Sequence, residues 1–232
     1  MSNNVFQRPR GTSWEFKWED AYSTLKSEAA APGFETAVSL GPDPIRTIEL
    51  NYTILLAGSK GRTRDQLVGF FNLRGGDFDD FLVDLGALTK NPADSSIVGQ
   101  VLNVDAHGYA PIQLTHYVSA AENWQENIYE LAGVNSNPGT APVLKLNGTP
   151  MSEGTDYVFY GPGYSISGET FPGLMAVIIH GLSGGDVVTA DFSWYYRVKF
   201  EQPKQEFEMF HWLLWKLQQM RMVVRRGPAI PV

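Results

Sequence analysis

The sequence lacks several features that would point directly to a class of protein. It contains no cysteine, which excludes disulfide bonds, thiolate metal sites and a cysteine nucleophile, and suits a reducing cytoplasm. Its formal net charge is -7, which argues against a dedicated nucleic-acid or anionic-membrane binder. No apolar run approaches the roughly 20 residues of a membrane span, and the first ten residues lack the apolar core of a signal peptide. We therefore expect a soluble protein that is made in the cytoplasm.

The motifs of common catalytic and cofactor sites are also missing. The sequence has no phosphate-binding glycine loop, and Gly163–Gly168 has the wrong frame for a serine nucleophile elbow. The histidines show no zinc-ligand spacing; they are His107, His116, His180 and His211. We therefore expect that the protein binds neither a metal nor a cofactor and is not an enzyme. A glycosidase stays open as an alternative, because its two carboxylates can lie far apart in the sequence.

What the sequence does contain is a long pattern of alternating side chains from Asp186 to Phe200. The even positions from Val188 onward are apolar or aromatic, and most odd positions are polar. Successive side chains of a strand point to opposite faces, so this pattern predicts one strand with a buried face, far longer than the usual ~5–6 residues. With 232 residues, 43% of them hydrophobic, the chain can bury a core of one large β domain or two small ones.

The first ninety residues predict strands and one helix. Trp14–Tyr22 alternates aromatic and charged residues, as a strand does. The runs Phe34–Leu40 and Ile45–Ala57 flank a Gly-Pro-Asp-Pro turn, so we predict that they form a hairpin. Arg64–Arg74 predicts a short helix on that hairpin, with a capping box at Thr63 and Gln66 and a Gly-Gly stop after it.

A group of aspartates follows this helix: Asp77, Asp79, Asp80 and Asp84. A two-carboxylate acid/base site and a calcium loop are both conceivable, but the ligand frame of an EF-hand is absent. We favour a turn followed by a strand, in which Phe78 and either Phe81 or Leu82 pack inward and the carboxylates are solvated.

The middle of the chain predicts a small β domain. Five strand candidates alternate with segments rich in turn residues; they are Ile97–Val104, Pro111–Val118, Pro142–Leu146, Tyr157–Tyr160 and Leu174–Ile179. Asn147-Gly148 predicts a type I′ hairpin turn, which needs positive φ at both positions.

The segment after the long strand is ambiguous. Apolar residues recur three to four apart, which favours a helix over Lys204–Gln218 followed by a strand over Met220–Val224. Phe, Trp and Met fit both kinds of element, so part of this helix can instead be strand.

Several of these segments together resemble one protein family. They are the turn Arg74–Phe81, the Pro142–Thr149 and Gly154–Tyr157 segments, and the aromatic strand within Gly185–Phe200. From about Phe34 onward the chain resembles the minor tail proteins of tailed phages that are related to distal tail proteins and also occur in gene-transfer-agent tails.

This resemblance implies a structural virion protein of the tail, made in the host cytoplasm. Residues 1–90 and 186–232 would form a tail-tube-like β-sandwich or barrel with a flanking helix, and 91–185 an inserted, peripheral β-rich domain. The first domain would assemble into a homo-oligomeric ring, often a hexamer, between the tail tube protein and the baseplate hub or tail-tip proteins. DNA would traverse the ring without specific binding, and the acidic balance is consistent with this because a basic lumen would hold phosphates.

Two alternatives stay open beside the ring. A carbohydrate-binding module that recognises a host receptor would need exposed, coplanar aromatics, for which the candidates are Trp14, Trp18, Trp124, Tyr160 and Tyr164. A tail-associated glycan hydrolase would need two carboxylates converging in a cleft.

If the ring hypothesis holds, the polar positions of the long strand can face a neighbouring subunit. We predict Tyr195 as the first contact residue, with Arg197 and Lys199 beside it.

Overall fold

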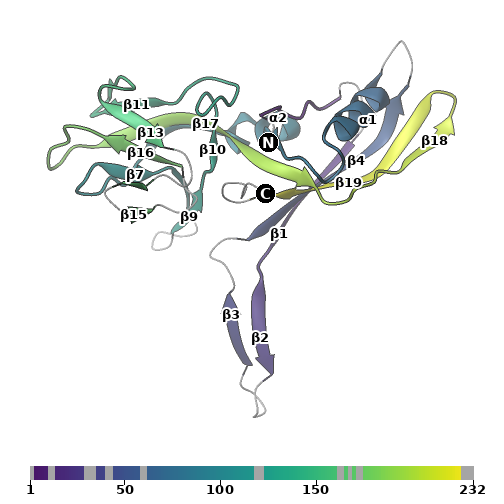
Figure 1. Ribbon diagram of the computed structural model, residues 1–232, viewed down its shortest axis with the longest axis horizontal. Coiled ribbons are helices and arrows are strands. Elements are labelled where there is room, and N and C mark those ends of the chain that lie inside the picture. Colours follow the sequence, from purple (N-terminus) through teal and green to yellow (C-terminus); the bar gives the residue numbers. More distant parts are fainter. Residues whose placement is uncertain are drawn as a thin grey trace. The chain divides into compact units, whose positions relative to one another are not determined.

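The chain is mainly β, as the sequence predicted. The computed structural model describes residues 3–9, 14–28, 35–39, 44–57, 62–117, 123–160, 165–166, 169–170 and 175–225. Figure 1 shows strands throughout and two short helices among these residues. Neither helix of the described part is long and apolar enough to cross a membrane.

Two compact units share the chain. Unit 1 comprises Met1–Arg8, Asp80–Arg197 and Arg225–Val232, and unit 2 comprises Pro9–Asp79 and Val198–Val224. The unit boundaries fall at 8/9, 79/80, 197/198 and 224/225. The sequence suggested 90/91 and 185/186, and the second of these differs because most of the long strand pairs with strands of unit 1. The assignment of a ring domain and a peripheral domain stays a prediction.

Unit 2 is built on the 12-residue strand β4 (Ile45–Leu56). It pairs antiparallel with β1 (Trp14–Ala21) on one side and with β19 (Leu214–Val224) on the other. β19 in turn pairs with β18 (Phe207–His211) and with the last residues of β17 (Val188–Phe200). Alternate side chains of β4 are buried, so one face of this sheet carries the core of the unit.

The predicted hairpin between Phe34–Leu40 and Ile45–Ala57 is wrong. β3 (Glu35–Ser39) pairs with β2 (Thr24–Glu28), and β4 pairs with β1. β3 and β4 therefore have different partners and do not pair with each other. Most of the Gly-Pro-Asp-Pro segment lies outside the described residues. Prolines remove ladder donors, so they predict an interruption of pairing and do not predict which strands pair.

The helix α1 (Thr63–Leu73) confirms the predicted helix, although its first turn differs from the expected capping box. The Thr63 hydroxyl accepts from the Leu56 backbone N–H at 2.7 Å and donates to the Leu56 carbonyl at 3.2 Å. It therefore anchors the helix to the end of β4. At the other end Gly75 and Gly76 have φ of 63° and 69°, as a glycine stop requires.

The predicted helix over Lys204–Gln218 is also wrong. β18 and β19 form an antiparallel hairpin there, with a turn at Trp212 and Leu213. The hairpin pairs with β4 along most of β19. A strand in that position satisfies the backbone groups on this edge of β4, which a helix would leave unpaired. The predicted strand Met220–Val224 is the last part of β19.

Unit 1 is organised around β17. The strand pairs with β6, β10 and β11 within this unit, and the register along β11 runs from Val143 opposite Asp191 to Leu146 opposite Val188. Further elements of the unit are β5 (Phe81–Val83), α2 (Leu85–Thr89), the 3₁₀ turn η1 (Pro92–Asp94), β6 (Ser96–Val101), β7 (Tyr109–Pro111), β8 (Gln113–Tyr117), β9 (Asn123–Asn127), β10 (Glu130–Leu131), β11 (Val143–Leu146), β12 (Thr149–Pro150), β13 (Tyr157–Tyr160), β14 (Ser165–Ile166), β15 (Glu169–Thr170) and β16 (Ala176–Ile179).

The period-2 prediction for the long strand is confirmed. Along β17 the even positions are buried except Tyr196, which is half-buried, and the odd ones are half-buried except Arg197. The buried side chains of Val188, Ala190, Phe192 and Trp194 join the core of unit 1, which also contains Ile112, Leu131 and Leu144. Val198 and Phe200 belong to unit 2. The Asn147-Gly148 turn is confirmed as well, with φ of 50° and 84° between β11 and β12.

Candidate functional site

The predicted contact residues lie on the odd-numbered face of β17 but differ in environment. Arg197 is buried, whereas Tyr195 and Lys199 are half-buried. Tyr195 and Arg197 belong to unit 1, and Lys199 belongs to unit 2. The three residues therefore do not form one surface patch of equal accessibility.

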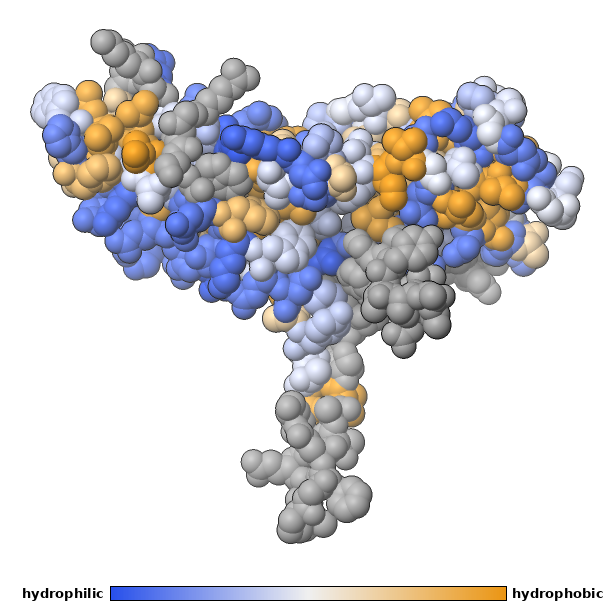
Figure 2. Space-filling view, turned by 180° about the vertical axis from the view of Figure 1, so that it is seen from behind, coloured by the Kyte–Doolittle hydropathy of each residue, from blue (hydrophilic) through white to orange (hydrophobic). Residues whose placement is uncertain are grey.

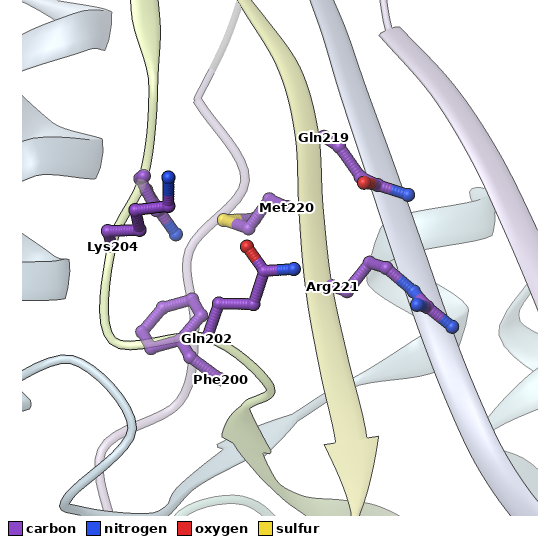
Figure 3. A pocket seen from close by; sticks show the side chains of 7 residues that line it. Phe200, Gln202, Lys204, Gln219, Met220 and Arg221 are labelled. Atoms are coloured by element: carbon purple, nitrogen blue, oxygen red, sulfur yellow. The ribbon is translucent and has the colours of Figure 1, made fainter.

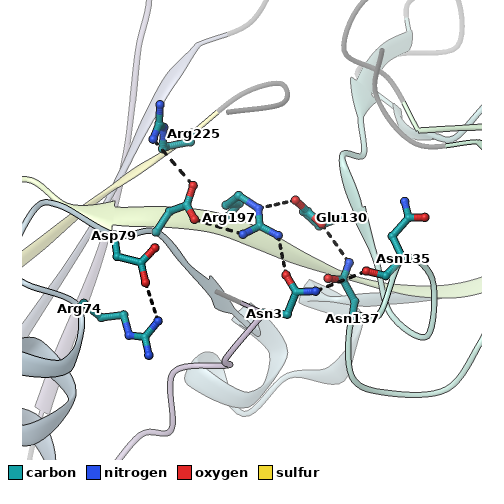
Figure 4. Close-up of polar contacts among 9 residues, drawn as sticks. Asn3, Arg74, Asp79, Glu130, Asn135, Asn137, Arg197 and Arg225 are labelled. Atoms are coloured by element: carbon teal, nitrogen blue, oxygen red, sulfur yellow. Dashed lines mark hydrogen bonds and ion pairs between the residues drawn. The ribbon is translucent and has the colours of Figure 1, made fainter. Parts of the chain in front are cut away.

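Arg197 is the centre of a buried polar cluster (Figure 4). Its Nη1 lies 3.3 Å from Oδ1 of Asp80, its Nη2 donates to Oδ1 of Asn3 at 3.1 Å, and its Nε donates to Glu130. The Nη1 of Arg225 lies 3.8 Å from the other oxygen of Asp80. Burial lowers the pKa of Arg197, but the hydrogen bond and charge of Glu130 and the charge of Asp80 outweigh it and raise the pKa. The guanidinium is thus permanently charged and committed to partners within the chain.

This cluster corrects the expectation that the aspartates after the helix are solvated, and it bears on the predicted subunit contact at Arg197. Asp80 is buried, not solvated, and Asp79 pairs with Arg74 at 2.7 Å. Phe78 is 89% exposed instead of packing inward, while Phe81 and Leu82 are buried as expected. A guanidinium held in this way offers few donors to a neighbouring subunit, so the contact hypothesis is better kept for Tyr195 and Lys199.

A hollow of about 340 Å³ lies beside Tyr195 in unit 1. Its walls come from α2 and η1, from the turn after β10, and from Ser193–Tyr195 of β17. Asp84 caps α2, because its Oδ1 accepts from the Ala87 backbone N–H at 3.1 Å, and it also accepts from the Ser95 hydroxyl at 2.6 Å. Burial, and secondarily the negative charge of Asp84, raises the pKa of Tyr195.

An apolar tip forms a second accessible feature, in unit 2. We define the hairpin tip as Met209, Phe210, Trp212 and Leu213, all of which are exposed. Figure 2 shows hydrophobic residues on the surface of the part of unit 2 that carries this hairpin, at the left of the view. Leu213 has a φ of 60°, a region that side chains other than glycine rarely adopt.

A smaller hollow in unit 2 lies between the end of β17 and β19 (Figure 3). Phe200, Lys204 and Met220 are among its lining residues. Its volume of about 10 Å³ is sufficient for about one water molecule. It is too small for an organic ligand.

Of the aromatic side chains proposed as a sugar platform, the structure describes those of Trp18 and Tyr160, which belong to different units. Trp18 is half-buried beneath the guanidinium of Arg46, which lies 5.2 Å from the ring centroid. Tyr160 is half-buried on β13. The side chains of Trp14 and Trp124, and all of Tyr164, lie outside the described residues.

Within the residues that the structure describes, no three His, Asp or Glu side chains are placed to hold a metal ion. His107, His180 and His211 are exposed, and the side chain of His116 is outside the described set. The Gly163–Gly168 loop also falls largely outside it.

No protein-family model matches the chain, and no curated protein is significantly similar to it. The two accessible features, the Tyr195 hollow and the hairpin tip, therefore rest on geometry. Sequence reasoning singled out Tyr195 but missed both Asp84 as a helix cap and the hairpin. An Asp directly before Leu-Gly-Ala was a usable signal for the start of α2.

Proposed function

We propose that the protein is a structural subunit of a phage tail that assembles into a ring through unit 2. The ring would join the tail tube protein to the baseplate hub or tail-tip proteins and surround the DNA path without binding DNA specifically. The resemblance of the sequence to distal tail proteins motivates the proposal. The observation that carries it is the exposed apolar hairpin tip.

The hairpin tip has the properties of a docking element for a second copy. Clustered exposed aromatic side chains are uncommon on a monomer and typical of interface cores. Phe and Trp each bury about 150–250 Å² when covered, so the tip would supply a substantial share of the ~800 Å² per partner in a stable interface.

The backbone of the turn supports the same proposal. A leucine at positive φ costs about 1–2 kcal/mol relative to glycine, and the chain carries this cost at an exposed turn. Leu213 is 43% exposed, so burial within the described chain covers its side chain only in part. Burial against a neighbouring subunit would offset the strain.

The test is the oligomeric state of the full chain, measured by light scattering and negative-stain imaging, alone and with tail tube protein from the same genome. We expect rings for the wild type and monomers for the double variant Phe210→Ser, Trp212→Ser. The matched control is Phe78→Ser, which removes another exposed phenylalanine of unit 2 and should leave the ring intact.

A wild type that stays monomeric both alone and with tube protein would overturn the proposal. Rings that persist in the double variant would overturn the role of the hairpin tip. Circular dichroism should show unchanged β content in both variants, because the substituted side chains are exposed.

A further inference from the structure

The Tyr195 hollow presents polar groups that the chain itself does not use. The hydroxyls of Tyr195, Ser193 and Thr140 make no hydrogen bond to another described residue, and neither does the second carboxylate oxygen of Asp84. Ligand sites combine apolar or aromatic surface with a few convergent polar groups of this kind. A volume of about 340 Å³ lies at the lower end of the ~300–1,000 Å³ that small-molecule sites occupy.

The surroundings of these groups determine which of them donate hydrogen bonds and which accept them. Because burial and the charge of Asp84 raise the pKa of Tyr195, its phenol stays protonated and can donate a hydrogen bond. Asp84 is an acceptor through its second oxygen, because its first oxygen already accepts from Ala87 and Ser95. The hollow thus offers a donor, an acceptor and hydroxyls that can act as either.

The charge of the lining selects among ligands. None of its residues is a lysine, arginine or histidine, and Asp84 is its one carboxylate. A phosphate, sulfate or carboxylate ligand would meet uncompensated negative charge here. A neutral ligand with several hydroxyls would match the donors and acceptors and pack against the tyrosine ring.

Gly139 contributes the space next to the Tyr195 hydroxyl. A Cβ at this position would lie 3.0 Å from that oxygen, and Gly139 has a φ of 106°, so a side chain is disfavoured there on both counts. The backbone of the turn therefore keeps the phenol accessible from the hollow.

We propose that this hollow binds a single neutral hexose unit, either free or as a residue of a glycan. Tyr195 donates to a sugar hydroxyl and Asp84 accepts from one. This site is distinct from the aromatic platform that the sequence suggested, and it does not depend on ring assembly through the hairpin tip.

The test is nuclear magnetic resonance of the full chain with free glucose, galactose, mannose and N-acetylglucosamine, and then with their methyl glycosides. We expect at least one neutral hexose to bind with a dissociation constant in the millimolar range or below. Methyl glycosides that bind as well as the free sugar would indicate a glycan residue as the source. Loss of binding on methylation would indicate a free sugar.

Two conservative variants localise the binding. Tyr195→Phe removes only the hydroxyl, and Asp84→Asn keeps the oxygen that caps α2 while replacing the outward acceptor with a donor. Each should weaken binding about tenfold, the effect of losing one hydrogen bond of about 1.4 kcal/mol. Tyr22→Phe, an exposed tyrosine of unit 2, should leave the affinity within about twofold of the wild type.

Labelled tyrosine gives a direct readout of contact. The tyrosine signal that is absent from Tyr195→Phe should be the one that the sugar shifts. The proposal is overturned if no neutral hexose binds, or if both variants bind as well as the wild type. It is also overturned if Tyr195→Phe abolishes rings while no sugar binds, because the hollow is then a subunit contact. Ring assembly is measured separately, so a result that overturns one of the two proposals does not overturn the other.

Discussion

The guanidinium of Arg197 lies 3.3 Å from the carboxylate of Asp80, 117 residues away, and both side chains are almost fully buried. Asp80, Arg197 and Arg225 are also the unit 1 residues at three of the four points where the chain passes between the two units. In addition, the Arg225 backbone N–H donates to the Arg197 carbonyl at 2.7 Å. One ion cluster therefore joins three segment ends within unit 1.

Breaking this cluster should cost far more than breaking a surface pair. Arg197→Met leaves two carboxylates without their main counter-charge, so we expect the free energy of unfolding to fall by about 3–5 kcal/mol in urea titrations. Lys17→Met removes a partner of the exposed Lys17–Glu19 pair and should cost less than about 1 kcal/mol. Adding Asp80→Asn to Arg197→Met should recover part of the loss. A single Arg197→Met variant as stable as Lys17→Met would contradict this account.

Two phenylalanines of unit 2 offer a matched comparison of burial. The ring of Phe200 is buried and lies 5.0 Å from the ring of Phe71 on α1, while Phe78 is exposed. Phe200→Ala should reduce the free energy of unfolding by about 3–5 kcal/mol because it leaves a cavity under the helix. Phe78→Ala should change it by at most about 0.5 kcal/mol. Equal losses for the two variants would show that α1 does not depend on this contact.

Local patterns in the sequence predicted local structure well. The alternation along 186–200 identified β17, because one face of that strand enters a core and the period of two is preserved. Asn147-Gly148 identified its turn because the backbone there needs positive φ at both positions. These signals depend only on neighbouring residues, so no knowledge of the rest of the fold is needed.

Structure that depends on distant partners was not predictable. β4 has two plausible partners in sequence, β1 and β3, and local propensity does not choose between them. The sequence of the β18–β19 hairpin suggested a helix because the hairpin tip carries exposed apolar residues on both faces. The alternation of polar and apolar residues that indicates a strand is therefore missing there. The surroundings of the candidate sites were not predictable for the same reason. The residues around Arg197 and Tyr195 come from segments that are far apart in the chain.

Two glycines of unit 1 test the cost of a left-handed turn. Gly148 has a φ of 84° with no heavy atom within 4 Å of an added Cβ, whereas Gly184 has equal space and no positive φ. Gly148→Ala should therefore lower the free energy of unfolding by about 1–2 kcal/mol through backbone strain alone. Gly184→Ala should be neutral or stabilise by about 0.4–1 kcal/mol, because it restricts the unfolded chain. Calorimetry that shows the same change for both would contradict the turn geometry.

Acid should weaken unit 1 through Asp191. The hydrogen bond from Lys145, at 2.5 Å between Nζ and Oδ2, and then the bond from the Gly99 backbone N–H lower the pKa of Asp191. A carboxyl whose pKa is lower in the folded state contributes its full stabilisation above the unfolded pKa of about 3.9. This contribution is lost as the pH falls from there through the folded pKa, because the unfolded chain takes up the proton first.

Asp191→Asn should therefore lower the unfolding free energy at pH 7 and flatten its decline below about pH 4. Lys145→Met removes the larger cause of the shift, so its pH profile should be flatter as well. Urea titrations at a series of pH values, with the three proteins side by side, measure both effects. If the profiles of Asp191→Asn and the wild type stay parallel down to pH 3, the Lys145–Asp191 pair does not stabilise the folded chain in the way its geometry indicates.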